Sequence, residues 1–176
     1  MPKVIIAFLL CIGFVNGYGQ TKKRAPLYLI INYNKTLSDI TAGNNARSLG
    51  LGLQRFSTSS TVIKPTVELS ADVYLMDDKL LRIWADGTPV NTVGTMFTIF
   101  GGGYVDIADY FYISMVGGPG FLGGQTLLGI KPSIGIHVDK EKQLTAKFSY
   151  INILNREPRA KQNFTSFSFS LAISIR

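Results

Sequence analysis

The segment from Phe164 to Arg176 alternates at a period of two between large apolar side chains and small ones from Ser166 onward. Such alternation predicts a β-strand. The polar face carries only serine and alanine, whereas a half-buried strand of a soluble sandwich usually carries charges there. A small, neutral face is typical of a strand that lines a crowded, hydrated lumen and turns its apolar face to lipid. The segment alone fits either fold. The apolar face consists of Phe167, Phe169, Leu171, Ile173 and Ile175.

The alternation recurs along the rest of the chain and predicts an all-β protein. We expect the strand at residues 110–116 to end at the glycines that follow it. We also expect a β-bulge at Pro132, because proline has no N–H to donate to a ladder. The predicted strands cover about residues 27–34, 47–57, 65–76, 92–105, 110–116, 127–138, 143–150 and 164–176.

The connections between these strands are expected to alternate in length. Those after the second, fourth and sixth strands are short, and those after the first, third, fifth and seventh are longer. An even number of strands with this alternation is typical of an outer-membrane barrel, and closure removes exposed strand edges. The sequence therefore predicts an eight-stranded antiparallel transmembrane β-barrel with up-and-down meander topology. The alternatives are a secreted, soluble lipocalin-like barrel that binds an apolar ligand, and a narrow ion-conducting channel.

The first residues have the features of a secretory signal peptide. Lys3 precedes an apolar run from Val4 to Val15, and small residues follow at Gly17 and Gly19. A run of about 12 residues is too short to span a bilayer as a helix, which needs about 20. We expect cleavage after residue 19, which assigns 1–19 to the signal peptide and 20–176 to the barrel.

Composition agrees with an exported β-protein. The chain has 46% hydrophobic residues and only 16% charged residues, so disorder is excluded. Its single cysteine lies inside the predicted signal peptide, so the mature chain has no disulfide. The net charge of +7 comes from scattered basic residues in an exported chain, which favours an anionic membrane surface over nucleic acid.

A glycine-dotted strand, Leu127-Leu-Gly-Ile-Lys-Pro-Ser-Ile-Gly135, leads to a charged turn, and the last strand is rich in phenylalanine and serine. In these features the chain resembles the outer-membrane β-barrel family of Gram-negative bacteria, including small barrels similar to outer-membrane proteins A and X. The resemblance covers residues 26–176 and implies an outer-membrane location and insertion by the barrel-assembly machinery. Members commonly end on an aromatic residue that this machinery recognises, whereas this chain ends on Ile175-Arg176.

Some small outer-membrane barrels are enzymes, but this sequence does not favour catalysis. The only histidine is His137, beside the short turn at residues 139–142, the predicted periplasmic end. Known catalytic barrels hold their reactive groups toward the outer leaflet or surface. One histidine without a mature cysteine provides no metal-ligand spacing, and the glycine clusters follow no phosphate-loop pattern. We therefore expect no enzyme activity, no metal and no cofactor.

Four charged residues, two of each sign, are predicted to point into the lumen: Glu68, Asp72, Lys131 and Lys147. Side chains fill the interior of an eight-stranded barrel, and buried charges are tolerated when they are paired. We expect both carboxylates to pair with the two lysines and to close the lumen. The alternative is that the four charges line an ion path.

The predicted external connections suggest a structural or surface-interaction role. The segment from Asp77 to Asn91 is the longest of them and contains Trp84. Arg156, Arg159 and Lys161 in the last connection could bind the phosphates of lipopolysaccharide. Outer-membrane lipid is the other expected partner, and the sequence identifies no protein partner.

Overall fold

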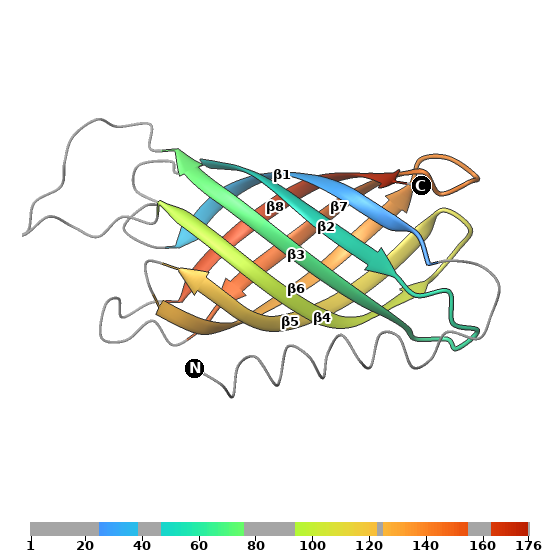
Figure 1. Cartoon of the computed structure of the whole chain (residues 1–176), viewed down its shortest axis with the longest axis horizontal. Coiled ribbons are helices and arrows are strands. Elements are labelled where there is room, and N and C mark those ends of the chain that lie inside the picture. The colour runs from blue at the N-terminus through green and yellow to red at the C-terminus, as the bar shows by residue number, and fades with distance from the viewer. Residues whose placement is uncertain (1–24, 39–46, 76–93, 123–124, 155–162, 176) are drawn as a thin grey trace, which may run out of the picture.

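The computed structural model describes residues 25–38, 47–75, 94–122, 125–154 and 163–175. These residues form eight antiparallel strands, each paired with its neighbours in the chain, and β1 pairs with β8 to close a barrel (Figure 1). This confirms the predicted fold class and meander topology. The strands are β1 (Leu27–Ser38), β2 (Arg47–Phe56), β3 (Lys64–Leu75), β4 (Thr95–Asp106), β5 (Phe111–Leu122), β6 (Gln125–His137), β7 (Leu144–Ile153) and β8 (Phe164–Ile175).

The two ends of the barrel differ in the chain segments that lie there. The connections from β2 to β3, β4 to β5 and β6 to β7 lie at the same end as the start of β1 and the end of β8 (Figure 1). We call this the turn end, and the other the opposite end. The predicted periplasmic side corresponds to the turn end.

The alternation read from the sequence decides which side chains point inward. On β1, Leu27, Leu29 and Ile31 are exposed, whereas Tyr28 and Ile30 between them are buried. The same two-residue alternation of burial runs through β2 and most of β8. Each strand therefore has one face toward the lumen and one on the outer surface.

The prediction for β5 was wrong in its length. The strand does not stop at Val116 but continues through the glycine-rich run to Leu122, so only residues 123–124 separate it from β6. A Cβ atom at Gly118, where φ is +156°, would lie 2.3 Å from the carbonyl oxygen of Ile99. Glycine thus allows the close approach of β4 that continues the strand. The expected long connection after the fifth strand is not present.

The bulge expected at Pro132 was also wrong. The ladder between β6 and β7 pairs Ile130 with Asn152 and Ser133 with Ser149, so the register is the same on both sides of the proline. Between these two pairs, Lys131 and Pro132 have no partner on β7 in the ladder. A bulge requires an extra residue, whereas a missing N–H removes a hydrogen bond without changing the spacing of the strand.

Candidate functional site: the filled lumen

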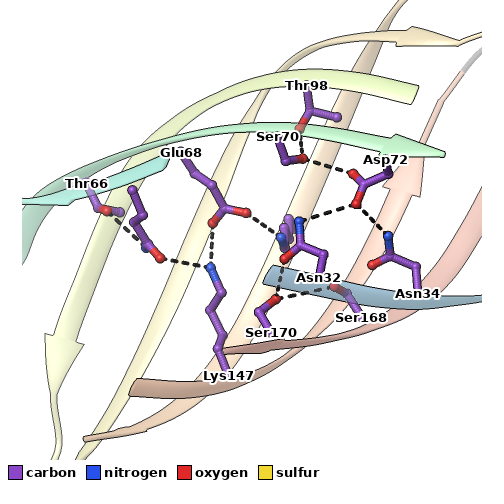
Figure 2. Close-up of polar contacts among 12 residues, drawn as sticks. Asn32, Asn34, Thr66, Glu68, Ser70, Asp72, Thr98, Lys147, Ser168 and Ser170 are labelled. Carbon is purple, nitrogen blue, oxygen red and sulfur yellow. Dashed lines mark hydrogen bonds and ion pairs between the residues drawn. The ribbon is translucent and has the colours of Figure 1, made fainter. Parts of the chain in front are cut away.

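Glu68 on β3 binds two lysines that cross the lumen from the far wall. Its Oε2 lies 2.6 Å from Nζ of Lys147 on β7, and its Oε1 accepts a hydrogen bond from Nζ of Lys131 on β6. All three side chains are almost completely buried. Figure 2 shows Glu68 and Lys147 pointing toward each other across the lumen. One carboxylate is therefore shared by two ammonium groups in the middle of the barrel.

Gln54 on β2 extends this cluster along the wall. Nζ of Lys147 donates to Oε1 of Gln54 at 3.0 Å, and Nε2 of Gln54 donates to Oγ1 of Thr66 at 3.3 Å. Gln54 and Glu68 are cross-strand partners in the ladder between β2 and β3. Lys147 therefore reaches two adjacent inward positions of the opposite wall.

Asp72 lies in a second cluster. Its carboxylate accepts hydrogen bonds from Nδ2 of Asn34 at 2.8 Å, Nδ2 of Asn32 at 3.3 Å and Oγ of Ser70 at 3.0 Å (Figure 2). Among the described residues Asp72 has no ion pair within 4.0 Å, so the expected pairing of two carboxylates with two lysines differs from what the structure shows.

The position of Asp72 explains this difference. A Cβ atom at Gly50, its cross-strand partner on β2, would lie 2.0 Å from Oδ1 of Asp72. The carboxylate therefore lies flat over the glycine, directed along the wall toward the amides of β1. The two-residue alternation also directs Asn32, Asn34 and Gln54 into the lumen, but it cannot identify their partners, because those come from other strands.

Aromatic and aliphatic side chains fill the lumen on both sides of these polar clusters. At the turn end, Phe56 packs edge-to-face against Tyr28, Tyr104 and Tyr112, with centroid distances of 5.3, 4.7 and 5.6 Å. At the opposite end, Tyr74 packs against Phe164 with centroids 5.4 Å apart, and a cluster of buried apolar residues surrounds this pair. That cluster also contains Met96, Phe100, Val116, Ile151 and Ile153.

His137 lies at the turn end, in a group of polar and charged side chains. Its ring stacks on Tyr112 at 5.0 Å, and its Nδ1 is 3.1 Å from Oγ1 of Thr145. Asp106 lies 2.5 Å from Nζ of Lys64 and 3.7 Å from Nε2 of His137. No group of three or more potential metal ligands occurs within the described residues.

The outer surface of the barrel is apolar between charged margins. On β2, Leu49, Leu51 and Leu53 are exposed and lie between Arg47 and Arg55, which are also exposed. Eight residues of strand span about 26 Å, and a tilt of about 40° leaves about 20 Å along the barrel axis. That height is close to the apolar band of about 25 Å found on transmembrane barrels.

The distribution of polarity also bears on the soluble alternative. A lipocalin-like barrel holds an apolar ligand in its interior and has a polar outer surface. Here the hydrogen-bonded charges lie in the interior, and aliphatic side chains lie on the outer surface. Within the described part of the chain, we find no helix with the length and hydropathy needed to cross a bilayer.

Several predicted features lie outside the described residues. They are the signal peptide, Trp84, and the three basic residues proposed to bind lipopolysaccharide, Arg156, Arg159 and Lys161. The structure gives no position for any of them.

Comparisons with known proteins agree with the fold. No protein-family model matches the chain, and no curated protein does. A de novo designed transmembrane β-barrel has a TM-score of 0.56 at 8% identity, with 88% of this chain and 98% of that chain covered. The outer-membrane protein Ail of Yersinia pestis in a phospholipid nanodisc has a TM-score of 0.55 at 10% identity, with 86% and 100% covered. The crystal structure of Ail has a TM-score of 0.51 at 11% identity, with 86% and 98% covered. The closed eight-stranded meander and these similarities show that the chain has the fold of the small transmembrane β-barrels of outer membranes.

Proposed function

We propose that the protein is a non-enzymatic outer-membrane barrel whose lumen is closed by its own side chains and which has a structural or surface-interaction role. The observation that carries this proposal is the arrangement of the inward side chains in layers along the barrel. An apolar layer lies at each end, and an ion-paired polar layer lies between them.

A closed lumen follows from the small diameter of the barrel. The interior of eight strands is just wide enough for side chains to fill. An ion crossing it would have to pass both apolar layers and to displace a lysine from Glu68, which is 1% exposed. Breaking a buried ion pair by removing one partner costs about 3–5 kcal/mol, so steady conduction is unfavourable.

Conductance across planar lipid bilayers tests this part of the proposal. The purified, folded protein should give no steady conductance, while a general porin inserted in the same membrane serves as the positive control. A steady, large conductance would contradict the closed lumen and would favour the alternative of an ion channel.

Fractionation of cells that express the full chain tests the location. The protein should appear in the outer-membrane fraction, and its gel mobility should change on boiling. The mass of the membrane-bound form should correspond to residues 20–176 if the signal peptide is removed after residue 19. Recovery in the soluble periplasm with no mobility shift would reject the membrane location.

The proposed surface interaction rests on the basic residues of the last connection. Ail, which has a similar fold, has been crystallised with the heparin analogue sucrose octasulfate, a polyanion. We propose that Arg156, Arg159 and Lys161 bind the phosphates of lipopolysaccharide. Replacing all three by serine should weaken lipopolysaccharide binding in a pull-down.

The matched control for this experiment changes basic residues at the turn end of the barrel. Replacing Lys140 and Lys142 in the turn between β6 and β7 by serine should leave lipopolysaccharide binding unchanged. Equal binding by the unmodified protein and the triple variant would reject the contact.

A further inference from the structure

Four serines form a row across the inner wall of the barrel. In the ladders, Ser114 on β5 pairs with Ser133 on β6, Ser133 with Ser149 on β7, and Ser149 with Ser168 on β8. All four point into the lumen and are buried. Because serine is small, the side chains of this row extend less far into the lumen than the large inward residues elsewhere, such as Phe56 and Tyr112.

Lys131 and Lys147 flank the Ser133–Ser149 pair at the centre of this row. Lys131 is two residues from Ser133 on the inner face of β6, and Lys147 is two residues from Ser149 on the inner face of β7. Since the two strands are antiparallel, the lysines lie on opposite sides of the serine pair. Both lysines bind Glu68 on the far wall, so their side chains form an arch over the two serines.

The hydrogen bonds under this arch are incomplete. The Oγ atoms of Ser133 and Ser149 are buried and have no hydrogen-bond partner. An ammonium group has three donors, of which Lys131 uses one on Glu68, and Lys147 uses two, on Glu68 and Gln54. Two donors on Lys131 and one on Lys147 therefore have no acceptor among the described residues. Buried polar groups are nearly always hydrogen-bonded to protein or to ordered water.

We propose that the space between the Ser133–Ser149 pair and the lysine arch is a binding site for ordered water. Two hydroxyl groups and two ammonium groups surround it, which provides the two to four polar partners that a buried water molecule needs. Water there accepts hydrogen bonds from the lysines and donates hydrogen bonds to the serines. No contact between the described residues satisfies these groups directly. The water thereby solvates the ion cluster inside the closed barrel.

Nuclear magnetic resonance of the isotope-labelled full barrel in lipid nanodiscs tests the site. Nuclear Overhauser transfer from water to the backbone protons of Ser133 and Ser149 should have the sign of long-lived, protein-bound water. Ser166 is the matched control, because its Oγ donates within the protein to the carbonyl oxygens of Lys35 and Phe167. Its protons should show no such transfer.

Variants make the assignment specific. Replacing Ser133 and Ser149 together by alanine should abolish the transfer at these positions, whereas Ser166→Ala should leave it unchanged. Gel mobility before and after boiling shows that each variant is folded, and the single alanine variants replace the double variant if it does not fold.

Three results would overturn the proposal. The first is no transfer from water at either serine in the unmodified protein, and the second is transfer with the sign of freely diffusing water. The third is a halide ion at this position in crystals grown with bromide. These outcomes are separate from the conductance result, because a barrel can be closed to ions with or without water under the arch.

Discussion

Glu68 and Lys147 come from opposite sides of the barrel wall and meet in the lumen, with Oε2 and Nζ 2.6 Å apart. The residues are 79 positions apart in the chain, so this contact connects the first half of the barrel to the second. Lys131 binds the same carboxylate, and the following predictions start from this buried cluster.

Glu68→Gln should be more destabilising than Lys147→Met. The glutamine variant leaves two buried ammonium groups without a counter-charge, whereas the methionine variant leaves Glu68 paired with Lys131. Removing one partner of a buried ion pair costs about 3–5 kcal/mol, which we expect for Glu68→Gln. Urea unfolding in lipid vesicles, followed by gel mobility, measures the difference. Glu141→Gln in the exposed turn serves as control, and equal midpoints for Glu68→Gln and this control would refute a role for Glu68 in stability.

Leu51→Arg should destabilise the protein in lipid vesicles by about 2–4 kcal/mol, the cost of an arginine on the lipid face near the bilayer centre. Leu51 is exposed midway between Arg47 and Arg55. Val62→Arg is the control, because Val62 lies in the turn between β2 and β3 and is 79% exposed. Urea unfolding compares the two variants. If both are neutral, the outer face of β2 does not contact lipid.

Gly135→Ala should destabilise the barrel, since the added Cβ would lie 2.1 Å from Cζ of Tyr112. Overpacking of this kind typically costs about 1–3 kcal/mol. At Gly101 a Cβ would have no atom within 4 Å, so Gly101→Ala is the matched control. In a double-mutant cycle measured by unfolding, Gly135→Ala should cost less in a Tyr112→Ala background. Additive effects would show that the two side chains do not compete for the same space.

The turn between β6 and β7 should contribute stability that depends on pH. The carboxylate of Asp139 accepts hydrogen bonds from the backbone N–H groups of Leu144 at 2.8 Å and Gln143 at 3.0 Å. These bonds lower the pKa of Asp139 below its ordinary value of about 3.9. Its contribution is therefore fully present above that value and is lost as the pH falls through the lowered pKa.

Asp139→Asn tests this dependence. The variant should be less stable than the unmodified protein at pH 7, and the two unfolding midpoints should converge as the pH falls below about 3.9. A difference in unfolding midpoint that stays constant with pH would show that the effect comes from the geometry of the asparagine side chain and not from the lost carboxylate charge.

The sequence alone determined the β-strands and the direction in which their side chains point. A period of two separates lumen from lipid on β1, β2 and β8, because successive residues of a strand must point to opposite faces. The inward positions of Glu68, Lys131 and Lys147 followed from the same rule. The limits of β5 did not follow, because glycine and proline end strands in some contexts, and only the close approach of Ile99 to Gly118 shows that they do not here.

Only the tertiary structure decided which lumen residues meet. Alternation gives the face of each residue but not its height in the barrel relative to residues on distant strands, which depends on the register of every ladder between them. The register brings both lysines to Glu68 and leaves Asp72 over Gly50, within reach of Asn32 and Asn34. The contacts between side chains across the lumen therefore depend on the stagger of the strands, which is fixed only when the barrel has closed.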